Sequence, residues 1–120
     1  MKTSLPRNPL PYLLTLLALA LLILLLRPRW LLNLTQRVEV SPQVGAALVE
    51  KHNCRGCHLI GGSGVYFAPN LDDAARRESA ETLFNWLANP RGVKANTAMP
   101  NFHLSDSEIQ AIIAYLKSNP

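Results

Sequence analysis

The clearest contrast along the chain separates an uninterrupted apolar run from a longer stretch of mixed polar and apolar positions. The run LPYLLTLLALALLILLL, residues 10–26, contains no charged residue. A helix over these 17 residues reaches roughly 26 Å, slightly less than the ~30 Å hydrocarbon core of a bilayer. Residues 30–32, Trp-Leu-Leu, extend the apolar length beyond the first arginines. We therefore expect a single membrane anchor over residues 10–32, after a cytoplasmic N-terminus of residues 1–9 and before a linker of residues 33–42.

A cleaved signal peptide is the alternative explanation of the apolar run. Cleavage would need small residues after the apolar core, and the sequence LLLRPRW offers none. An uncleaved anchor is therefore favoured. Its orientation does not follow from charge, because two basic residues precede the run and three follow it before residue 40.

The rest of the chain contains three stretches with helical periodicity. Each has a serine at or next to its first residue that can cap the first turn, and the third adds a capping box between Ser105 and Glu108. No segment alternates like a strand over more than a few residues, so the predicted fold is all-α, with an N-terminal transmembrane helix before a small helical domain. The helical stretches are residues 41–54, 78–90 and 104–120, and the apolar face of the last consists of Ile109, Ile112, Ile113 and Leu116.

The sequence CRGCH, residues 54–58, carries the most specific chemistry. Two cysteines separated by two residues fit a zinc site, a redox dithiol or covalent attachment of haem. A zinc site needs four ligands, and the chain has no other cysteine. A thioredoxin-like dithiol should lie near a βαβ pattern, which the sequence lacks. Haem attachment is favoured, with thioethers at Cys54 and Cys57 and with His58 as an axial ligand of the iron.

A haem would also supply the core that this domain lacks. Three short helices joined by long loops cannot bury much apolar surface. Met99 lies in the loop TAMPNF and is followed by Pro100; apart from Met1 it is the only methionine. A methionine opposite His58 would close both axial positions of the iron and raise the reduction potential. The sequence therefore favours an electron carrier over a haem protein that binds substrate.

The charge distribution gives no sign of a nucleic-acid surface. The net charge of +4 arises in the first forty residues, whereas seven basic and seven acidic residues balance from Ser41 onward. The excess of basic residues lies in the first forty residues and not in the helical domain, so no nucleic-acid partner is expected.

Five blocks of the sequence together resemble one known family. CRGCH, APNL, LFNWLANP, TAMPNF and IIAYLKS occur in the order and spacing of class I cytochromes c. The resemblance implies a monohaem cytochrome c domain over residues 43–120, with one covalently bound haem c. It also implies an electron-transfer role without an active site of its own.

The same resemblance implies roles for individual residues. The carbonyl of Pro69 is expected to accept a hydrogen bond from the ring N–H of His58 and so to fix the ligand. Gly45 in the first helix of the domain is expected to let Tyr115 of the last helix cross closely. Trp86 would reach a haem propionate, with plain core packing as the alternative.

A narrower resemblance rests on GGSGVYFAPNL after the haem motif and on AMPNFHLSDSEI around Met99. Both are similar to the small cytochrome c subunit of bacterial nitric oxide reductases. This implies an outward-facing haem domain that passes electrons to a large multi-span membrane catalytic subunit. It further implies a calcium ion at the subunit interface, near Gly64 and Tyr66.

Two classes of function stay open at this point. The first is an electron-transfer subunit of a nitric oxide reductase or another terminal oxidase, or an anchored shuttle, served by a soluble or membrane electron donor. The second is a haem gas sensor with an exchangeable sixth ligand. The first class implies a single-pass protein in contact with lipid in the bacterial inner membrane. Because haem is attached to C-x-x-C-H outside the cytoplasm, the domain should face the periplasmic side.

Several residues near the motif also have plain structural explanations. The glycines of GGSG can supply positive φ angles in a tight loop. Tyr66 and Phe67 would cover the porphyrin. His52 and His103 are expected at the surface, although His103 lies close enough to Met99 in sequence to replace it as ligand.

Overall fold

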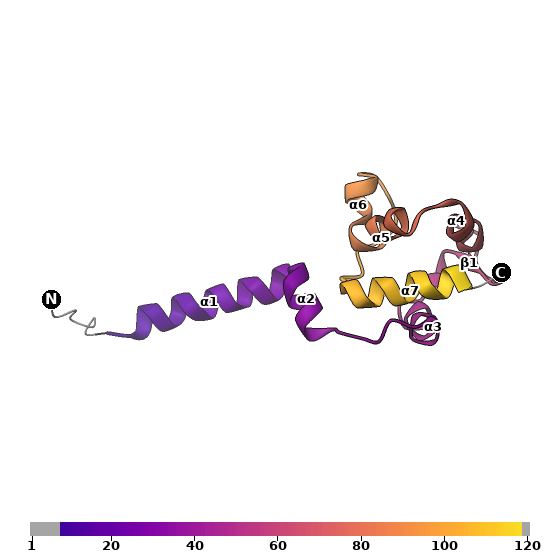
Figure 1. Ribbon diagram of the computed structural model, residues 1–120. Helices are drawn as coiled ribbons and strands as arrows, with labels where there is room; N and C mark the ends of the chain where they lie inside the picture. Colours follow the sequence, from indigo (N-terminus) through magenta and orange to yellow (C-terminus); the bar gives the residue numbers. More distant parts are fainter. Residues whose placement is uncertain (1–7, 119–120) are drawn as a thin grey trace.

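The structure is a computed structural model that describes residues 8–118, in which one long apolar helix leads into a cluster of short helices (Figure 1). Residues 1–7 of the expected cytoplasmic N-terminus, and residues 119–120, lie outside the described residues. In chain order the elements are α1 (Leu10–Leu26), α2 (Arg29–Thr35), α3 (Pro42–Lys51), the 3-10 helix η1 (Cys54–Gly56), β1 (Leu59–Ile60), β2 (Ser63–Gly64), α4 (Leu71–Arg77), α5 (Ala80–Ala88), α6 (Pro90–Val93) and α7 (Asp106–Ser118).

The apolar run forms α1, but this helix stops earlier than expected. Arg27 adopts a left-handed conformation, with φ 44° and ψ 57°. Pro28 follows; it has no N–H to donate and disfavours helical geometry in the residue before it. The axis of α2 is bent by 83° from that of α1, so residues 30–32 do not prolong the apolar helix. Within residues 8–118, no single helix is long and apolar enough to cross a membrane; α1 and α2 reach the length and composition of a span only as a pair, with the 83° bend between them.

The domain is built around α7, which contacts α2, α3, α4 and α5. Its closest approach is to α3 at Gly45. A Cβ at Gly45 would lie 2.0 Å from the carbonyl oxygen of Ala111 and 2.7 Å from the Cβ of Tyr115, which confirms the expected crossing. The fully or almost fully buried apolar residues around this crossing are Leu48, Val49, Ile60, Ala75, Leu83, Leu104, Ile109, Ala111, Ile112, Ile113 and Leu116.

The helix starts follow the predicted capping serines. The side chains of Ser41 and Ser79 each accept a hydrogen bond from the amide three residues further on. The capping box of α7 is reciprocal: Ser105 N donates to Glu108 Oε2 at 2.9 Å, and Glu108 N donates to Ser105 Oγ at 3.2 Å. The predicted caps are thus confirmed, and so is the buried face of α7.

Two short helices lie where loops were expected. Asn70 caps α4 by accepting a hydrogen bond from Asp72 N at 2.8 Å. The helix predicted to end at residue 90 ends at Ala88, and Pro90 begins α6, which Asn89 caps. Both helices are too short for their apolar periodicity to be recognised, and each depends on a local cap.

A small hairpin interrupts the otherwise helical domain. β1 and β2 pair antiparallel, with Leu59 opposite Gly64 and Ile60 opposite Ser63. Gly61 and Gly62 between them have φ angles of 61° and 72°, as a type I′ turn requires. The expected positive φ angles of these glycines are confirmed, and the expected helical domain holds with this one addition.

Candidate functional site

The segment that carries the two cysteines is a tight turn after α3. The helix ends at Lys51, before the motif, and Asn53 adopts a left-handed conformation with φ 52°. η1 then folds the motif on itself, with Cys57 N and His58 N both donating to Cys54 O at 3.2 and 3.0 Å. Cys54 is half-buried and Cys57 is exposed. Consecutive tight turns therefore gather both thiols and the histidine in one short segment.

The ring of His58 is oriented by a backbone carbonyl. Its Nδ1 lies 2.7 Å from Pro69 O. A carbonyl can only accept, so Nδ1 carries the proton and the lone pair of the neutral ring is on Nε2. Metal-ligating histidines are held in this way, by an acceptor on the far side of the ring that fixes both the tautomer and the direction of the free nitrogen.

The loop before Pro69 is tied to the motif by backbone hydrogen bonds. Val65 N donates to Arg55 O at 3.0 Å, and Phe67 N and Ala68 N donate to Cys57 O at 3.2 and 2.8 Å. The loop therefore follows the motif closely, and it places the Pro69 carbonyl at the histidine ring.

Gly64 makes this close approach possible. Its φ angle is 122°, and a Cβ there would lie 2.2 Å from the carbonyl oxygen of His58. The hairpin turn is also held from outside, because Gly61 N donates to both carboxylate oxygens of Asp72 at 3.0 and 2.8 Å. No pattern in the sequence pointed to Asp72, since its partner is a backbone amide eleven residues away.

The residues beside the motif present an unusual amount of apolar surface. Val65, Tyr66 and Phe67 are 51%, 73% and 76% exposed. Three consecutive large apolar side chains at the surface, next to a half-buried histidine with its Nε2 lone pair available, fit a bulky apolar group that would lie against them. Covalent haem is such a group, and the residues present therefore fit it.

Met99 lies in the long connection between α6 and α7. It is half-buried, and its backbone amide donates to Thr97 Oγ1 at 3.2 Å. His103, the alternative ligand, adopts a left-handed conformation with φ 52°, and its amide donates to Asn101 Oδ1 at 2.9 Å.

Trp86, expected near a haem propionate, is half-buried in α5. Gly64 at the end of β2 and Tyr66 just after this strand, the residues expected near calcium, are both exposed.

Arg55, one of the two variable residues of the motif, has partners that no local sequence pattern indicates. It forms an ion pair with Glu50 of α3 and donates from Nη2 to Tyr115 Oη of α7 at 3.0 Å. Its side chain is 22% exposed. Arg55 therefore connects the motif to the two helices that cross at Gly45.

Two side chains in or next to the motif have shifted pKa values, Cys54 and His52. Burial raises the pKa of the Cys54 thiol, so the group stays protonated at neutral pH. Burial, and then the charge of Lys51, lower the pKa of His52. His52 was expected at the surface, but it packs edge-on against Phe102 with ring centroids 5.5 Å apart. Its Nε2 is buried, without a hydrogen-bond partner among the described residues.

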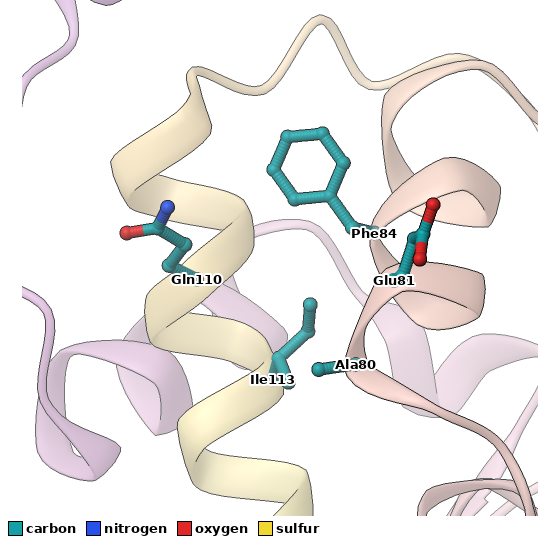
Figure 2. Close-up of a pocket in the computed structure, with 5 residues that line it drawn as sticks. All are labelled: Ala80, Glu81, Phe84, Gln110 and Ile113. Atoms are coloured by element: carbon teal, nitrogen blue, oxygen red, sulfur yellow. The ribbon is translucent and has the colours of Figure 1, made fainter.

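Two surface hollows of about 300 Å³ each lie away from the motif. Figure 2 shows the first, between α5 and α7, where Phe84 and Ile113 supply apolar walls and Glu81 and Gln110 lie at its edge. The second lies where the end of α1 and the start of α2 meet the domain, and it includes His103. Neither hollow is lined by a residue of the CRGCH segment or by Met99.

Comparisons with known proteins place the chain in a family. A family model described as cytochrome c matches residues 43–120. The chain is 37% identical over 91 residues to the C subunit of the nitric oxide reductase of Stutzerimonas stutzeri, covering 69% of this chain and 62% of that protein. The corresponding protein of Paracoccus denitrificans is 35% identical over 89 residues, covering 65% of this chain and 59% of that protein.

A different oxidase subunit also matches. Cytochrome c oxidase subunit 2 of Alkalihalophilus pseudofirmus is 28% identical over 102 residues, covering 74% of this chain and 30% of that protein. The chain thus spans about three fifths of the two nitric oxide reductase proteins and less than a third of the cytochrome c oxidase protein.

Proposed function

The chain belongs to the cytochrome c family, and from this membership we propose that it is an electron-transfer subunit with one covalently bound haem c. Cys54 and Cys57 would hold the haem as thioethers, and His58 and Met99 would be the axial ligands. When bound, the haem supplies one-electron chemistry at its iron. The observation that carries the proposal is the hydrogen bond between His58 Nδ1 and Pro69 O, which leaves Nε2 as the nitrogen able to bind iron.

The two proposed ligands favour electron transfer over catalysis at the iron. His58 is a nitrogen donor held in one orientation, whereas Met99 is a soft thioether that favours the reduced metal. If both side chains bound the iron, no coordination position would stay open to a substrate. The protein would accept and pass on electrons without catalysis at its own iron.

Other residues would assist the haem without binding the metal. Val65, Tyr66 and Phe67 would cover one edge of the porphyrin and exclude water from it. Trp86 in α5 would lie toward a propionate. Backbone oxygens of Gly64 and Tyr66 would take part in a calcium site at the interface with the partner, because Ca²⁺ prefers oxygen ligands in loops.

The similarity to the C subunits of two nitric oxide reductases supports a place in such a complex. The chain would then pass electrons from a soluble or membrane donor to a large membrane-embedded catalytic subunit. α1 would anchor it in the bacterial inner membrane, in contact with lipid, with the haem domain on the periplasmic side. The exposed leucines of α1 support a lipid environment for this helix.

A second candidate is the cytochrome c module of another terminal oxidase. The similarity to a cytochrome c oxidase subunit 2 favours it specifically. The two candidates differ in the catalytic subunit, so mild detergent extraction of the tagged full chain and identification of what co-purifies would separate them. A partner with NO-reducing activity supports the first candidate, and a partner that reduces O₂ supports the second.

Covalent haem is tested first. Protein extracted with acid–acetone should keep its haem and give the alkaline pyridine haemochrome spectrum of two thioethers. A Cys54→Ala/Cys57→Ala variant is the matched control and should release all of it. Loss of haem from the wild-type chain into the acetone would refute covalent attachment.

A further inference from the structure

α2 packs on the haem domain and not along the apolar helix that precedes it. Asn33 Nδ2 donates to Asp106 Oδ2 at 2.9 Å, and Asp106 N donates to Asn33 Oδ1 at 2.8 Å. A side chain of α2 therefore satisfies an amide at the start of α7 that has no partner within its own helix. Leu32, in the same turn, is only 4% exposed.

Arg29 adds two contacts from the first turn of α2. Its guanidinium pairs with the Asp106 carboxylate and lies over the ring of Phe84, 5.3 Å from the centroid. Arg29 and Asp106 are both about two fifths exposed, so their ion pair is weak by itself. Together with Asn33 it fixes the direction of α2 across two helices of the domain, α5 and α7.

The residues that follow α2 are also bound to the first turn of α7. Ser105 Oγ donates to Gln36 O at 2.7 Å, and Val38 N donates to Ser107 Oγ at 3.1 Å. This segment was expected to be a linker. Its hydrogen bonds join it to the domain instead.

Only Arg27 and Pro28 connect α1 to α2. Arg27 N donates to Ile23 O at 3.1 Å and closes α1, whereas Leu32 N donates to Pro28 O at 3.2 Å and opens α2. Pro28 has a fixed φ angle. The end of α1 and the domain also share one hollow, lined by Leu26 and Arg27 on one side and by Asn101 and His103 on the other.

We infer that α2 is a brace that holds the haem domain in one orientation relative to α1. The inference rests on the proposed function, in which α1 lies in the membrane and the domain carries haem. A braced domain presents the same edge to a partner in the membrane at all times, so it favours a fixed subunit over a tethered shuttle that swings between donor and acceptor. Arg29, Asn33 and Asp106 are then positioning residues for electron transfer.

The brace can be tested by a distance measurement in the full-length holoprotein in lipid nanodiscs. Nitroxide labels at Leu16→Cys on α1 and Ala47→Cys on α3 report the arrangement of anchor and domain, since both positions are exposed. Double electron–electron resonance should give one narrow distance distribution. The added substitutions Arg29→Ala/Asn33→Ala should broaden it severalfold, while the haem spectrum and reduction potential stay unchanged.

Two further variants make the result decisive. Leu32→Ala removes the apolar contact without touching the polar pair and should also broaden the distribution. Asp73→Asn breaks an exposed ion pair with Arg76 in α4 and should leave it narrow. A broad distribution in the otherwise unchanged protein, or a narrow one after Arg29→Ala/Asn33→Ala, would overturn the brace. Failure of the proposed function would be seen separately, by mass spectrometry. Without covalent haem, Cys54 and Cys57 would also take up label, and each molecule would carry four labels instead of two.

Discussion

At the scale of residues, contacts between side chains and backbone groups hold the candidate site together. His58 is directed by the Pro69 carbonyl, and Asp72 holds the amide of Gly61. Gly64 allows the loop to approach the carbonyl of His58. Backbone groups in such turns cannot rotate independently, so these contacts orient the histidine before any haem is attached.

The proposed role of Met99 as ligand decides between an electron carrier and a gas-binding protein. If Met99 is the sixth ligand, the oxidised protein should show the weak near-infrared charge-transfer band of sulfur on ferric haem, and the reduced protein should bind CO poorly. Met99→Ala should abolish the band, lower the reduction potential and admit CO while the haem stays attached, because a soft ligand that favours ferrous iron is lost.

His103→Gln is the matched control for Met99→Ala, and it should leave the band and the potential as they are. The opposite pattern, with an unchanged spectrum in Met99→Ala and a changed one in His103→Gln, would make His103 the ligand. A wild-type protein that binds CO readily would instead support a gas sensor.

His52 should make the stability of the domain depend on pH. Its pKa in the folded state is below the ordinary value of 6.5, chiefly because of burial. The unfolded chain therefore binds a proton more readily than the folded one, and the free energy of unfolding falls as the pH drops below about 6.5. Urea unfolding at pH 7.5 and 5.5 should show this loss, and His52→Gln should reduce it. An equal loss in the wild type and in His52→Gln would contradict the assignment.

At the scale of elements, the domain depends on how closely α3 and α7 cross. A glycine inside a helix costs helix propensity, yet Gly45 is required here because Ala111 O and the Cβ of Tyr115 occupy the space of a side chain. The helix caps act alongside this crossing, since each satisfies amides that the short helices leave without a partner. The crossing also positions the motif, because Arg55 of the motif donates a hydrogen bond to Tyr115 of α7.

Gly45→Ala should therefore destabilise the domain more than an ordinary surface change. Its Cβ would meet backbone at 2.0 Å, so the two helices must move apart, at a cost of about 1–3 kcal/mol typical of overpacking. Thermal unfolding followed by circular dichroism measures it. Ala47→Ser, on an exposed face of the same helix, should change stability by no more than about 0.5 kcal/mol. Equal melting temperatures for the two variants would show that the crossing can relax.

At the scale of the whole molecule, the chain joins an apolar helix to a domain with a small core. The buried apolar residues come mainly from α3, α7 and single positions on the other elements, while large apolar side chains beside the motif stay exposed. A haem against these side chains would extend the core, and the proposed attachment would then contribute to stability as well as to function.

The proposed topology places residues 43–120 outside the cytoplasm, because attachment of haem to C-x-x-C-H takes place there. Protease added to intact spheroplasts should remove the haem-stained domain and leave a short membrane fragment. A cytoplasmic marker protein must survive the same treatment until the membrane is permeabilised. Protection of the haem domain in intact spheroplasts would reverse the orientation or exclude the anchor.

The sequence by itself determined the features that depend on neighbouring residues. The capping serines, the apolar face of α7 and the positive φ angles of Gly61 and Gly62 follow from local chemistry, and all are found in the structure. The motif CRGCH was equally recognisable, because its spacing is a local property of the chain.

Only the tertiary structure decided the features that depend on distant parts of the chain. The docking of α2 on α7, the burial of His52 against Phe102 and the contact of Arg55 with Tyr115 each join residues about fifty or more positions apart. The short helices α4 and α6 escaped prediction because a single turn or two carries too little periodicity to identify. The bend after Leu26 depends locally on Arg27 and Pro28, but its direction is set by packing on the domain, where the partners of Arg29 and Asn33 lie.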